Sequence, residues 1–464
     1  MIASKRIAFF VAVTCFVLGL VVLFSFDGTG DQGDSILHYL YAKYAPTHPE
    51  LYFNHWAKPL YVLLASPFAQ FGIEGIKFFN LLCISFTAFF TIKVAQEISV
   101  ENSWFAGVAV IFSPLVIVLT FSGLTEPLFA LFLIFGFYLL AKQKLSQAAI
   151  IFSFLPFVRS EGLIIIGAIG FFFLLKKNWK ALPWLALGHV VYSVLGVFVY
   201  GSFFWVFEKI PYSTLSSVYG NGGLFHYVIQ LNYVIGVPLN ILFWLGVLYL
   251  LFTFLKHKHI GLPHLILLTF VAFFVAHSLF WYLGIFNSMG LKRVLIAVIP
   301  LIGIIALYGL NLLLCFLKRK EFVRQSLLGV IVMVVLIFPF LSNPASVNWK
   351  RDMHLTADQV LINESRMFID ENDLSGARFF HAHPYISEAF EVDHFDQKQR
   401  MELTTNYPEL VKSGDIIVWD SWFAVVERHV GKEMIDADKN LERLNVFKNE
   451  VNGVSVVIAL YKVK

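Results

Sequence analysis

Charge is what this sequence lacks over most of its length. Asp, Glu, Lys and Arg make up only 14% of the 464 residues, and within residues 1–342 they fall almost entirely between long apolar blocks. A charged side chain inside hydrocarbon is costly, so the blocks themselves are candidates for membrane-spanning segments. With 58% hydrophobic and 17% aromatic residues, the composition excludes a soluble globular protein and predicts a chain that crosses a bilayer many times.

Cysteine is equally scarce. Cys15, Cys83 and Cys315 all lie within apolar blocks, so no disulfide framework is available. Residues 343–464 contain no cysteine and must build a core without covalent cross-links, which about 120 residues are enough to do. The absence of disulfides and the compact size favour a bacterial inner membrane as the location.

The net charge of +4 conceals two oppositely charged parts. Residues 1–342 carry 21 basic and 11 acidic side chains, whereas residues 343–464 carry 14 basic and 20 acidic ones. The positive charge sits in short breaks between apolar blocks, which is a signal of membrane topology. We therefore expect the lipid bilayer as a partner and no nucleic acid.

Eleven apolar blocks predict membrane helices, because backbone groups in lipid must find their hydrogen bonds within the chain. The blocks are residues 7–26, 75–98, 104–120, 127–141, 146–157, 160–175, 181–205, 230–254, 262–285, 294–316 and 325–342. Several are shorter than a full span. The pair 146–157 and 160–175 predicts a helical hairpin whose tip lies below the far surface of the membrane.

Lysine and arginine gather at alternate breaks, which orients the chain. The basic set includes Lys5-Arg6, Lys93 and the breaks at residues 142–144, 176–180, 256–258 and 318–324. By the positive-inside rule these breaks and the N-terminus are cytoplasmic, and eleven crossings then place residues 343–464 outside. Residues 27–74 form the largest exported loop, in which the apolar stretch 59–72 is too short to span and lies along the interface.

The predicted fold is thus an α-helical polytopic membrane protein with about 11 transmembrane helices in residues 1–342 and an extracytoplasmic α/β domain in residues 343–464. In the latter, the pattern predicts a helix over 357–371 and strands over 378–381, 416–419 and 454–462. Helices are also expected over 408–411 and 427–444.

Acidic residues in the exported breaks are the first candidates for chemistry. If the segment after the first membrane helix is helical, Asp31, Asp34 and His38 share one face, and a carboxylate held beside the bilayer can act as a base towards a hydroxyl. The alternative is a pair of solvated loop acids. Glu126, in a short exported turn, either begins a helix before Pro127 or contributes to the same polar face.

Basic residues on the exported side, where the positive-inside rule disfavours them, are the second candidates. Arg159, followed by Ser160 and Glu161, forms either a local ion pair or an anion site. Lys292 and Arg293 stand at the outer interface, where a specific phosphate site is favoured over snorkelling to lipid headgroups. His189 and His277 lie in apolar blocks and are expected to be packed core histidines.

Five stretches in this order resemble the GT-C superfamily of polyprenyl-phosphate-sugar glycosyltransferases. They are Gly33-Asp34 with His38-Tyr39, His55-Trp56-Ala57-Lys58-Pro59-Leu60-Tyr61, Thr125-Glu126-Pro127-Leu128, Arg159-Ser160-Glu161-Gly162, and Gly290-Leu291-Lys292-Arg293 with Pro300. The superfamily includes protein O-mannosyltransferases, lipid A aminoarabinose transferases and GPI mannosyltransferases. The resemblance covers residues 1 to about 340.

This resemblance implies a lipid-phosphate-sugar-dependent enzyme, a hexosyl- or pentosyltransferase that moves a sugar with inversion. The donor would be a polyprenyl-phosphate sugar, and the acceptor would be a hydroxyl of a glycan, lipid or protein. Asp34, or its competitor Asp31, would take the acceptor proton, while Arg159, Lys292 and Arg293 would stabilise the departing phosphate. It further implies substrate-binding roles for His38, His55, Glu126 and Glu161. Some superfamily members need a divalent cation such as Mg²⁺ or Mn²⁺, and others need none.

Two other classes of protein fit parts of the pattern. A transporter or flippase would place ionisable groups near the midplane, in interrupted helices with internal repeats, whereas this chain keeps charge out of its helix centres and shows no repeat. A non-enzymatic assembly protein leaves the exported acids and the Lys292-Arg293 pair unexplained. The glycosyltransferase is therefore the leading hypothesis.

Overall fold

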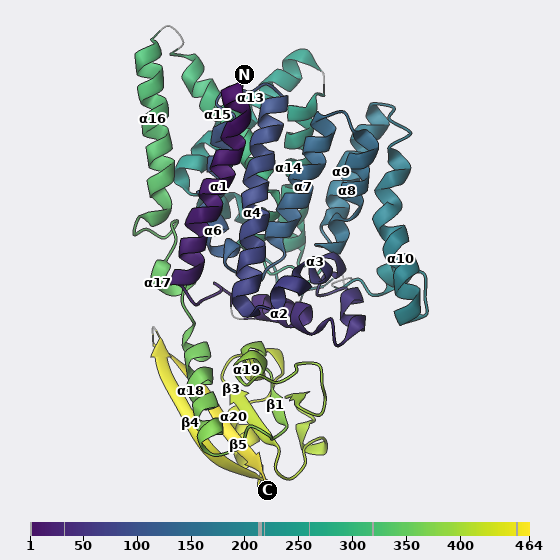
Figure 1. Ribbon diagram of the computed structural model, residues 1–464, viewed down its shortest axis with the longest axis vertical. Coiled ribbons are helices and arrows are strands. Elements are labelled where there is room, and N and C mark those ends of the chain that lie inside the picture. Colours follow the sequence, from purple (N-terminus) through teal and green to yellow (C-terminus); the bar gives the residue numbers. More distant parts are fainter. Residues whose placement is uncertain are drawn as a thin grey trace.

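The computed structural model describes residues 2–31, 33–211, 216–217, 219–258, 260–317, 320–451 and 453–464. It consists of a bundle of roughly parallel and antiparallel helices with a smaller domain, built around one sheet, beyond one end of it (Figure 1). Of the residues expected to be cytoplasmic, Lys318 and Arg319 lie outside the described ones.

All eleven predicted membrane segments are helical. Seven helical stretches are long and apolar enough to cross a membrane, namely Arg6–Ser25, Gly72–Glu97, Leu182–Tyr200, Val237–His257, Leu262–Leu283, Lys292–Cys315 and Glu321–Phe340. The apolar helices Glu126–Ala141, Leu145–Phe157 and Gly162–Leu175 are shorter. The protein is therefore an integral membrane protein, as the scarcity of charge predicts.

The element bounds follow the apolar blocks closely. In chain order the bundle comprises α1 (Ile2–Ser25), α4 (Gly72–Glu97), α5 (Trp104–Ile111), α6 (Pro114–Thr120), α7 (Glu126–Ala141), α8 (Leu145–Ser153) with η2 (Leu155–Phe157), α9 (Gly162–Leu175), η3 (Leu182–Ala186) with α10 (Leu187–Tyr200), α12 (His226–Ile235), α13 (Val237–His257), α14 (Leu262–Leu283), η4 (Lys292–Val298) with α15 (Ile299–Cys315), and α16 (Glu321–Ile337) with η5 (Phe338–Phe340). The block 104–120 is broken at Ser113, before Pro114, because proline cannot continue the preceding helix.

The centre of the bundle is α15, which packs between α13 and α5 and is almost entirely buried. Gly309 allows α15 to approach α13 closely, since a Cβ at this position would lie 1.9 Å from the carbonyl oxygen of Leu242. Small residues at such crossings are what membrane helices use in place of a hydrophobic driving force. The three cysteines are free.

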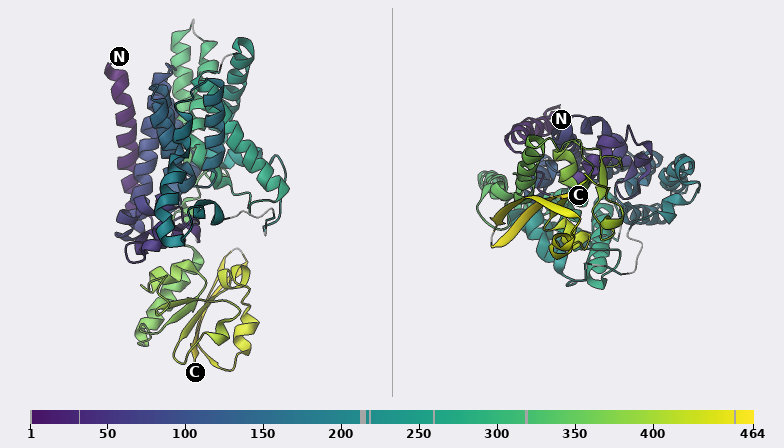
Figure 2. Two further views of the ribbon diagram at one scale, coloured as in Figure 1. Left: turned by 90° about the vertical axis from the view of Figure 1, so that its right-hand side faces the viewer. Right: turned by 90° about the horizontal axis from the view of Figure 1, so that it is seen from below.

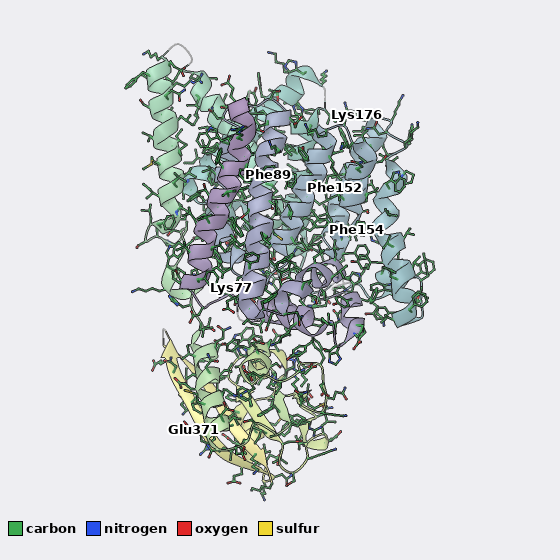
Figure 3. The ribbon with its side chains drawn as sticks, viewed as in Figure 1. Lys77, Phe89, Phe152, Phe154, Lys176 and Glu371 are labelled. Atoms are coloured by element: carbon green, nitrogen blue, oxygen red, sulfur yellow. The ribbon has the colours of Figure 1, made fainter. Side chains whose placement is uncertain are left out.

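Short helices occupy the bundle end that faces the smaller domain. The loop 27–74 folds into α2 (Asp34–Tyr44), η1 (Pro49–Phe53) and α3 (Pro59–Ala69), and α11 (Trp205–Glu208) follows α10. Both α2 and α3 lie at this end, while the N-terminus lies at the other (Figures 1 and 2). Lys77 lies at the same end and Lys176 lies at the opposite one (Figure 3). This division matches the alternation of charge in the sequence.

The C-terminal domain contains a five-stranded sheet in the order β2-β1-β3-β5-β4. Its strands are β1 (Phe379–His381), β2 (Arg400–Glu402), β3 (Ile416–Asp420), β4 (Leu441–Val451) and β5 (Val454–Val463). Strand β1 pairs in parallel with β2 and β3, while β5 pairs antiparallel with β3 and β4. The helices are α17 (Trp349–Asp352), α18 (Ala357–Glu371), α19 (Pro384–Ala389) and α20 (Lys432–Ala437), with short turns η6 (Tyr407–Glu409) and η7 (Phe423–Glu427).

The expected helix 357–371 and the strands near 378–381, 416–419 and 454–462 are confirmed, whereas the expected helix 427–444 is wrong. Only Lys432–Ala437 is helical there, and residues from Leu441 onwards form β4. The reason is tertiary, because β4 pairs along its whole length with β5 and that pairing overrides local propensity. The expected helix 408–411 is a single 3₁₀ turn at Tyr407–Glu409.

Candidate active site

Acids and cations singled out in the sequence meet at the end of the bundle next to the C-terminal domain. Arg293, at the start of η4, is the centre of this group. Its guanidinium binds Asp31 at 2.7 Å and Asp34 through a second, shorter ion pair, and its Nε lies 3.6 Å from Glu126. Residues more than 250 positions apart are thus joined through one side chain.

Arg159 forms the second ionic centre. From the tip between η2 and α9, its guanidinium contacts Glu126 and Glu161 at 2.8 Å each and donates to Thr125 at 3.1 Å. Glu126 is fully buried between Arg159 and Arg293. Burial raises the pKa of Glu161, but the charges of Arg159 and Lys58, together with backbone hydrogen bonding, outweigh it and leave that pKa lowered to about 2. The expected local ion pair at this tip is therefore present, as part of a larger network.

Asp31 and Asp34 differ in how their oxygens are used. Asp31 precedes α2, and its Oδ1 accepts hydrogen bonds from the backbone N–H groups of Gly33 and Ser35 at 3.1 and 2.9 Å. It thereby satisfies donors at the start of the helix, in the manner of an N-cap. Asp34 is the first residue of α2, 43% of its side chain is exposed, and its Oδ1 has no hydrogen bond within the described part of the chain. Asp34 has the more available oxygen.

His38 lies one turn further along α2 and is buried. Its ring stacks on Trp56 at 4.9 Å and meets the edge of Tyr61 at 5.4 Å. Burial, followed by the charge of Lys58, lowers the pKa of His38 to about 3, so this imidazole is neutral at physiological pH. A neutral ring with a free nitrogen can accept or donate one hydrogen bond to a ligand.

Lys58 also belongs to this group of residues, although the sequence pattern indicated it only as part of the stretch from His55 to Tyr61. It is buried, and its Nζ donates to Ser160 at 3.0 Å and to the carbonyl oxygen of His55 at 3.2 Å, with no carboxylate partner among the described residues. Burial lowers its pKa to about 8. Its φ of 71° is strained for a lysine, and such strain is typical of functional positions. One feature of the sequence could have identified Lys58, namely that this lysine falls on the side of the membrane where the positive-inside rule disfavours basic residues.

Two predicted residues point away from this network. His55 is held by a hydrogen bond of 3.0 Å from its Nε2 to the carbonyl oxygen of Val206, and burial lowers its pKa to about 4. Lys292 places its ammonium 5.5 Å from the ring centroid of Tyr233. The adjacent cations Lys292 and Arg293 thus leave η4 in different directions, and Arg293 is the one that meets the acids.

Several buried polar atoms around the network lack hydrogen-bond partners within the described part of the chain. Among them are Nδ1 of His38, Nε of Arg159, Nε2 of His277 and both carboxylate oxygens of Glu126, of which Oε1 has ion-pair contacts without a hydrogen bond. His277 was expected to be a packed core histidine, and its ring does pack on Phe273 at 4.5 Å. Because buried polar groups are normally hydrogen-bonded, these atoms favour a polar ligand in this region.

A divalent cation finds no matching ligand set among the residues that the structure describes. No group of three or more His, Cys, Asp or Glu side chains gathers there in a way that could hold a metal. The carboxylates of Asp31 and Asp34 are bound by a guanidinium instead. We therefore derive no step through a metal ion.

The fold and the site together define a polytopic membrane protein whose ion-pair network lies at the end of the helix bundle next to the small sheet domain. Its fold is similar to that of ArnT from Cupriavidus metallidurans. The crystal structure of ArnT bound to undecaprenyl phosphate aligns with a TM-score of 0.59 at 14% identity, over 96% of this chain and 97% of that one. The apo structure aligns with a TM-score of 0.56 at 13% identity over the same shares.

Comparison of sequences adds nothing to this, since no protein-family model matches the chain and neither does any curated protein. Identity of 14% over full-length coverage shows a shared fold. The expected polytopic helical bundle with a C-terminal α/β domain is thereby confirmed at the level of the fold. Because unrelated functions can share a fold, the function must be argued from the site.

Proposed function

We propose that the protein is an inverting glycosyltransferase that moves a sugar from a polyprenyl-phosphate donor to a hydroxyl acceptor. The observation that carries this proposal is the meeting of Asp31, Asp34, Glu126, Arg159 and Arg293 at one end of an ArnT-like bundle. A base for the hydroxyl and cations for a phosphate leaving group are what this transfer needs. That an ArnT structure holds undecaprenyl phosphate supports a lipid phosphate as donor.

In this reaction Asp34 is the base. The acceptor oxygen attacks the anomeric carbon from the face opposite the phosphate, through an oxocarbenium-like state, and the bond from that carbon to the phosphate oxygen breaks. The acceptor proton passes to Asp34, and the bonding electrons leave with the lipid phosphate. Asp34 is favoured over Asp31 because it is the more exposed acid and has a free oxygen, whereas Asp31 caps α2.

Lys58 and Arg159 are the cations placed to receive the departing phosphate. Lys58 has no acid partner in the described part of the chain, and Arg159 has an unpartnered Nε. Arg293 has a different role, since its three contacts with acids hold Asp34 and Glu126 in place. His38 and Glu161 border the same network, where they would contact the sugar.

The proposal includes an orientation. Residues 1–342 would form the catalytic membrane domain and residues 343–464 an extracytoplasmic domain, with the N-terminus in the cytoplasm of a bacterial cell and the site on the outer face of the inner membrane. The alternation of Lys and Arg supports this orientation. The acceptor, whether glycan, lipid or protein, would then reach the site from outside.

The test is sugar release from a defined donor. We would reconstitute the full chain in liposomes with undecaprenyl-phosphate mannose or undecaprenyl-phosphate aminoarabinose, with water as the acceptor, and measure the undecaprenyl phosphate and free sugar formed by hydrolysis. Asp34→Asn should lower the rate at least about 100-fold, because it removes the base. Glu50→Gln, at an exposed acid of the same loop, is the matched control and should retain the wild-type rate. Equal rates for Asp34→Asn and wild type, or no cleavage of either donor, would contradict the proposal.

A further inference from the structure

One rigid segment of the C-terminal domain, residues 420–428, extends towards the start of α2. The segment leaves the end of β3 and contains the π-helical turn η7, a rare element that is frequent at functional sites. The buried carboxylate of Asp420 holds it, accepting backbone N–H groups of Trp422 at 3.0 Å and Ala424 at 3.2 Å, and that of Phe423 as well. Its side chains are therefore presented in a fixed arrangement.

This segment lies directly against the residue that precedes the proposed base. Two carbons of the Phe423 ring would be 3.1 Å from a Cβ built on Gly33, so the ring rests on the backbone next to Asp34. On its other sides the Phe423 ring packs on His383 at 4.5 Å and on Trp422 at 4.7 Å. The aromatic pair of the C-terminal domain is thus fixed beside Asp34.

Exposed aromatic and acidic groups surround this contact. Trp422 is 49% exposed although it is one residue from a ring that touches α2. Tyr219, from the loop between α11 and α12, is 42% exposed and lies within electrostatic reach of both Glu427 and Asp34. Arg428, the cation of the segment, is engaged by Glu402. The described surface next to Asp34 therefore combines open ring faces with carboxylates.

We propose that Trp422, with Tyr219 and Glu427, binds the acceptor as an uncharged saccharide ring, which makes residues 420–428 the specificity-determining element of the transfer. The apolar C–H face of a pyranose stacks on an indole, and its hydroxyls donate hydrogen bonds to carboxylates. The carboxylates of Asp34 and Glu427 repel an anionic acceptor. A saccharide seated on Trp422 has its hydroxyls near Asp34, as the transfer requires. This inference rests on the proposed function.

The experiment measures saccharide binding and donor cleavage in parallel. Full-length protein in nanodiscs is applied to arrays of neutral glycans, peptides and phospholipids, and the release of undecaprenyl phosphate is followed without acceptor. Trp422→Ala should weaken glycan binding about tenfold or more, as expected for a lost stacking partner. Trp422→Phe should restore most of it, and Met367→Ala, at an exposed site on α18, should change nothing. Donor cleavage should be equal in the wild type and in Met367→Ala, which lies outside the site.

Three results would overturn the inference. The first is that the wild type binds no neutral glycan. The second is that wild type and Trp422→Ala bind glycans equally well. The third is that Trp422→Ala loses binding of peptides or phospholipids and keeps its binding of glycans. If donor cleavage is intact in these cases, only the acceptor assignment fails. If the wild type cleaves no donor, the proposed function fails and the inference with it.

Discussion

Asp34 and Asp31 show how two acids that share one arginine can have different capacities. Asp31 uses one oxygen for two backbone N–H groups and the other for Arg293. Asp34 uses a single oxygen for Arg293 and leaves the other available among the described residues. The distinction arises from the first turn of α2, since the helix begins at Asp34 and Asp31 lies just before it. Sequence spacing alone left both acids as candidates.

Lys58 leads to a prediction about pH. Its pKa of about 8 means that the ammonium is charged below that pH and neutral above it. Affinity for undecaprenyl phosphate should therefore be highest below pH 8 and fall about tenfold as the pH rises towards 10, because one charge-assisted contact is lost. Binding of radiolabelled undecaprenyl phosphate to the protein in nanodiscs between pH 7 and 10 measures this.

The control for this prediction is Lys58→Arg. A guanidinium stays charged across this range, so the variant should bind the lipid phosphate with little dependence on pH. The same decline in wild type and Lys58→Arg would show that another group titrates, and a flat wild-type profile would show that Lys58 does not contact the phosphate.

The sequence predicted which acidic and basic residues gather at the site better than it predicted the role of each of them. Exclusion of ions from hydrocarbon was enough to predict that Asp34, Arg159 and Arg293 belong to one face, and the structure places them in one network. Lys58 could not be singled out, because an interfacial lysine usually snorkels and only burial without an acid marks it as different. Lys292 and Arg293 could not be separated either, since their directions depend on the turn η4.

At the scale of elements, α2 connects the membrane bundle to the C-terminal domain. The start of α2 carries Asp34, and further along it Tyr39 donates to Glu388 of α19 at 2.8 Å and Lys43 contacts the same carboxylate at 2.7 Å. Tyr44, just beyond, donates to the carbonyl oxygen of Val392 at 3.0 Å. The helix that carries the proposed base is therefore held from the C-terminal domain along its length.

Glu388 should accordingly act as a positioning residue. Glu388→Ala frees one face of α2, and we expect kcat for donor cleavage to fall about ten- to a hundredfold while the Kd for undecaprenyl phosphate stays near that of the wild type. Glu388→Gln keeps an acceptor for Tyr39, so its kcat for donor cleavage should lie between those of the wild type and Glu388→Ala. Glu371→Gln, at the exposed end of α18, is the control (Figure 3). A fall in affinity with unchanged kcat would argue against a positioning role.

Elements were predictable where one physical rule dominates. Membrane helices follow from apolar length, so all eleven segments were found, whereas β4 was missed because it depends on pairing with β5. The strand β2, three residues long, has no local signal strong enough to detect. The helix α2 was expected only conditionally, since Gly33 and the acids before it also suit a turn.

At the scale of the whole molecule, the two ends of the bundle should face different compartments. In a variant without Cys15, Cys83 and Cys315, single cysteines at Lys176 and Glu371 lie at the far end of the bundle and in the C-terminal domain (Figure 3). A membrane-impermeant maleimide applied to spheroplasts should label Glu371→Cys and reach Lys176→Cys only after the membrane is permeabilised. Labelling of Lys176→Cys in intact spheroplasts would reverse the proposed orientation.

The shortness of α9 has a consequence for the membrane itself. Its 14 residues span about 21 Å, against roughly 30 Å for the hydrocarbon core. In the proposed orientation, the tip that carries Arg159 would therefore end well short of the outer headgroup plane, and the surrounding lipid would thin to meet it. Under the proposed function and orientation, a lipid phosphate approaching Lys58 and Arg159 would descend along a local dimple that the protein imposes on the outer leaflet. Hydrophobic mismatch, which most membrane proteins minimise, would here guide the substrate to its site.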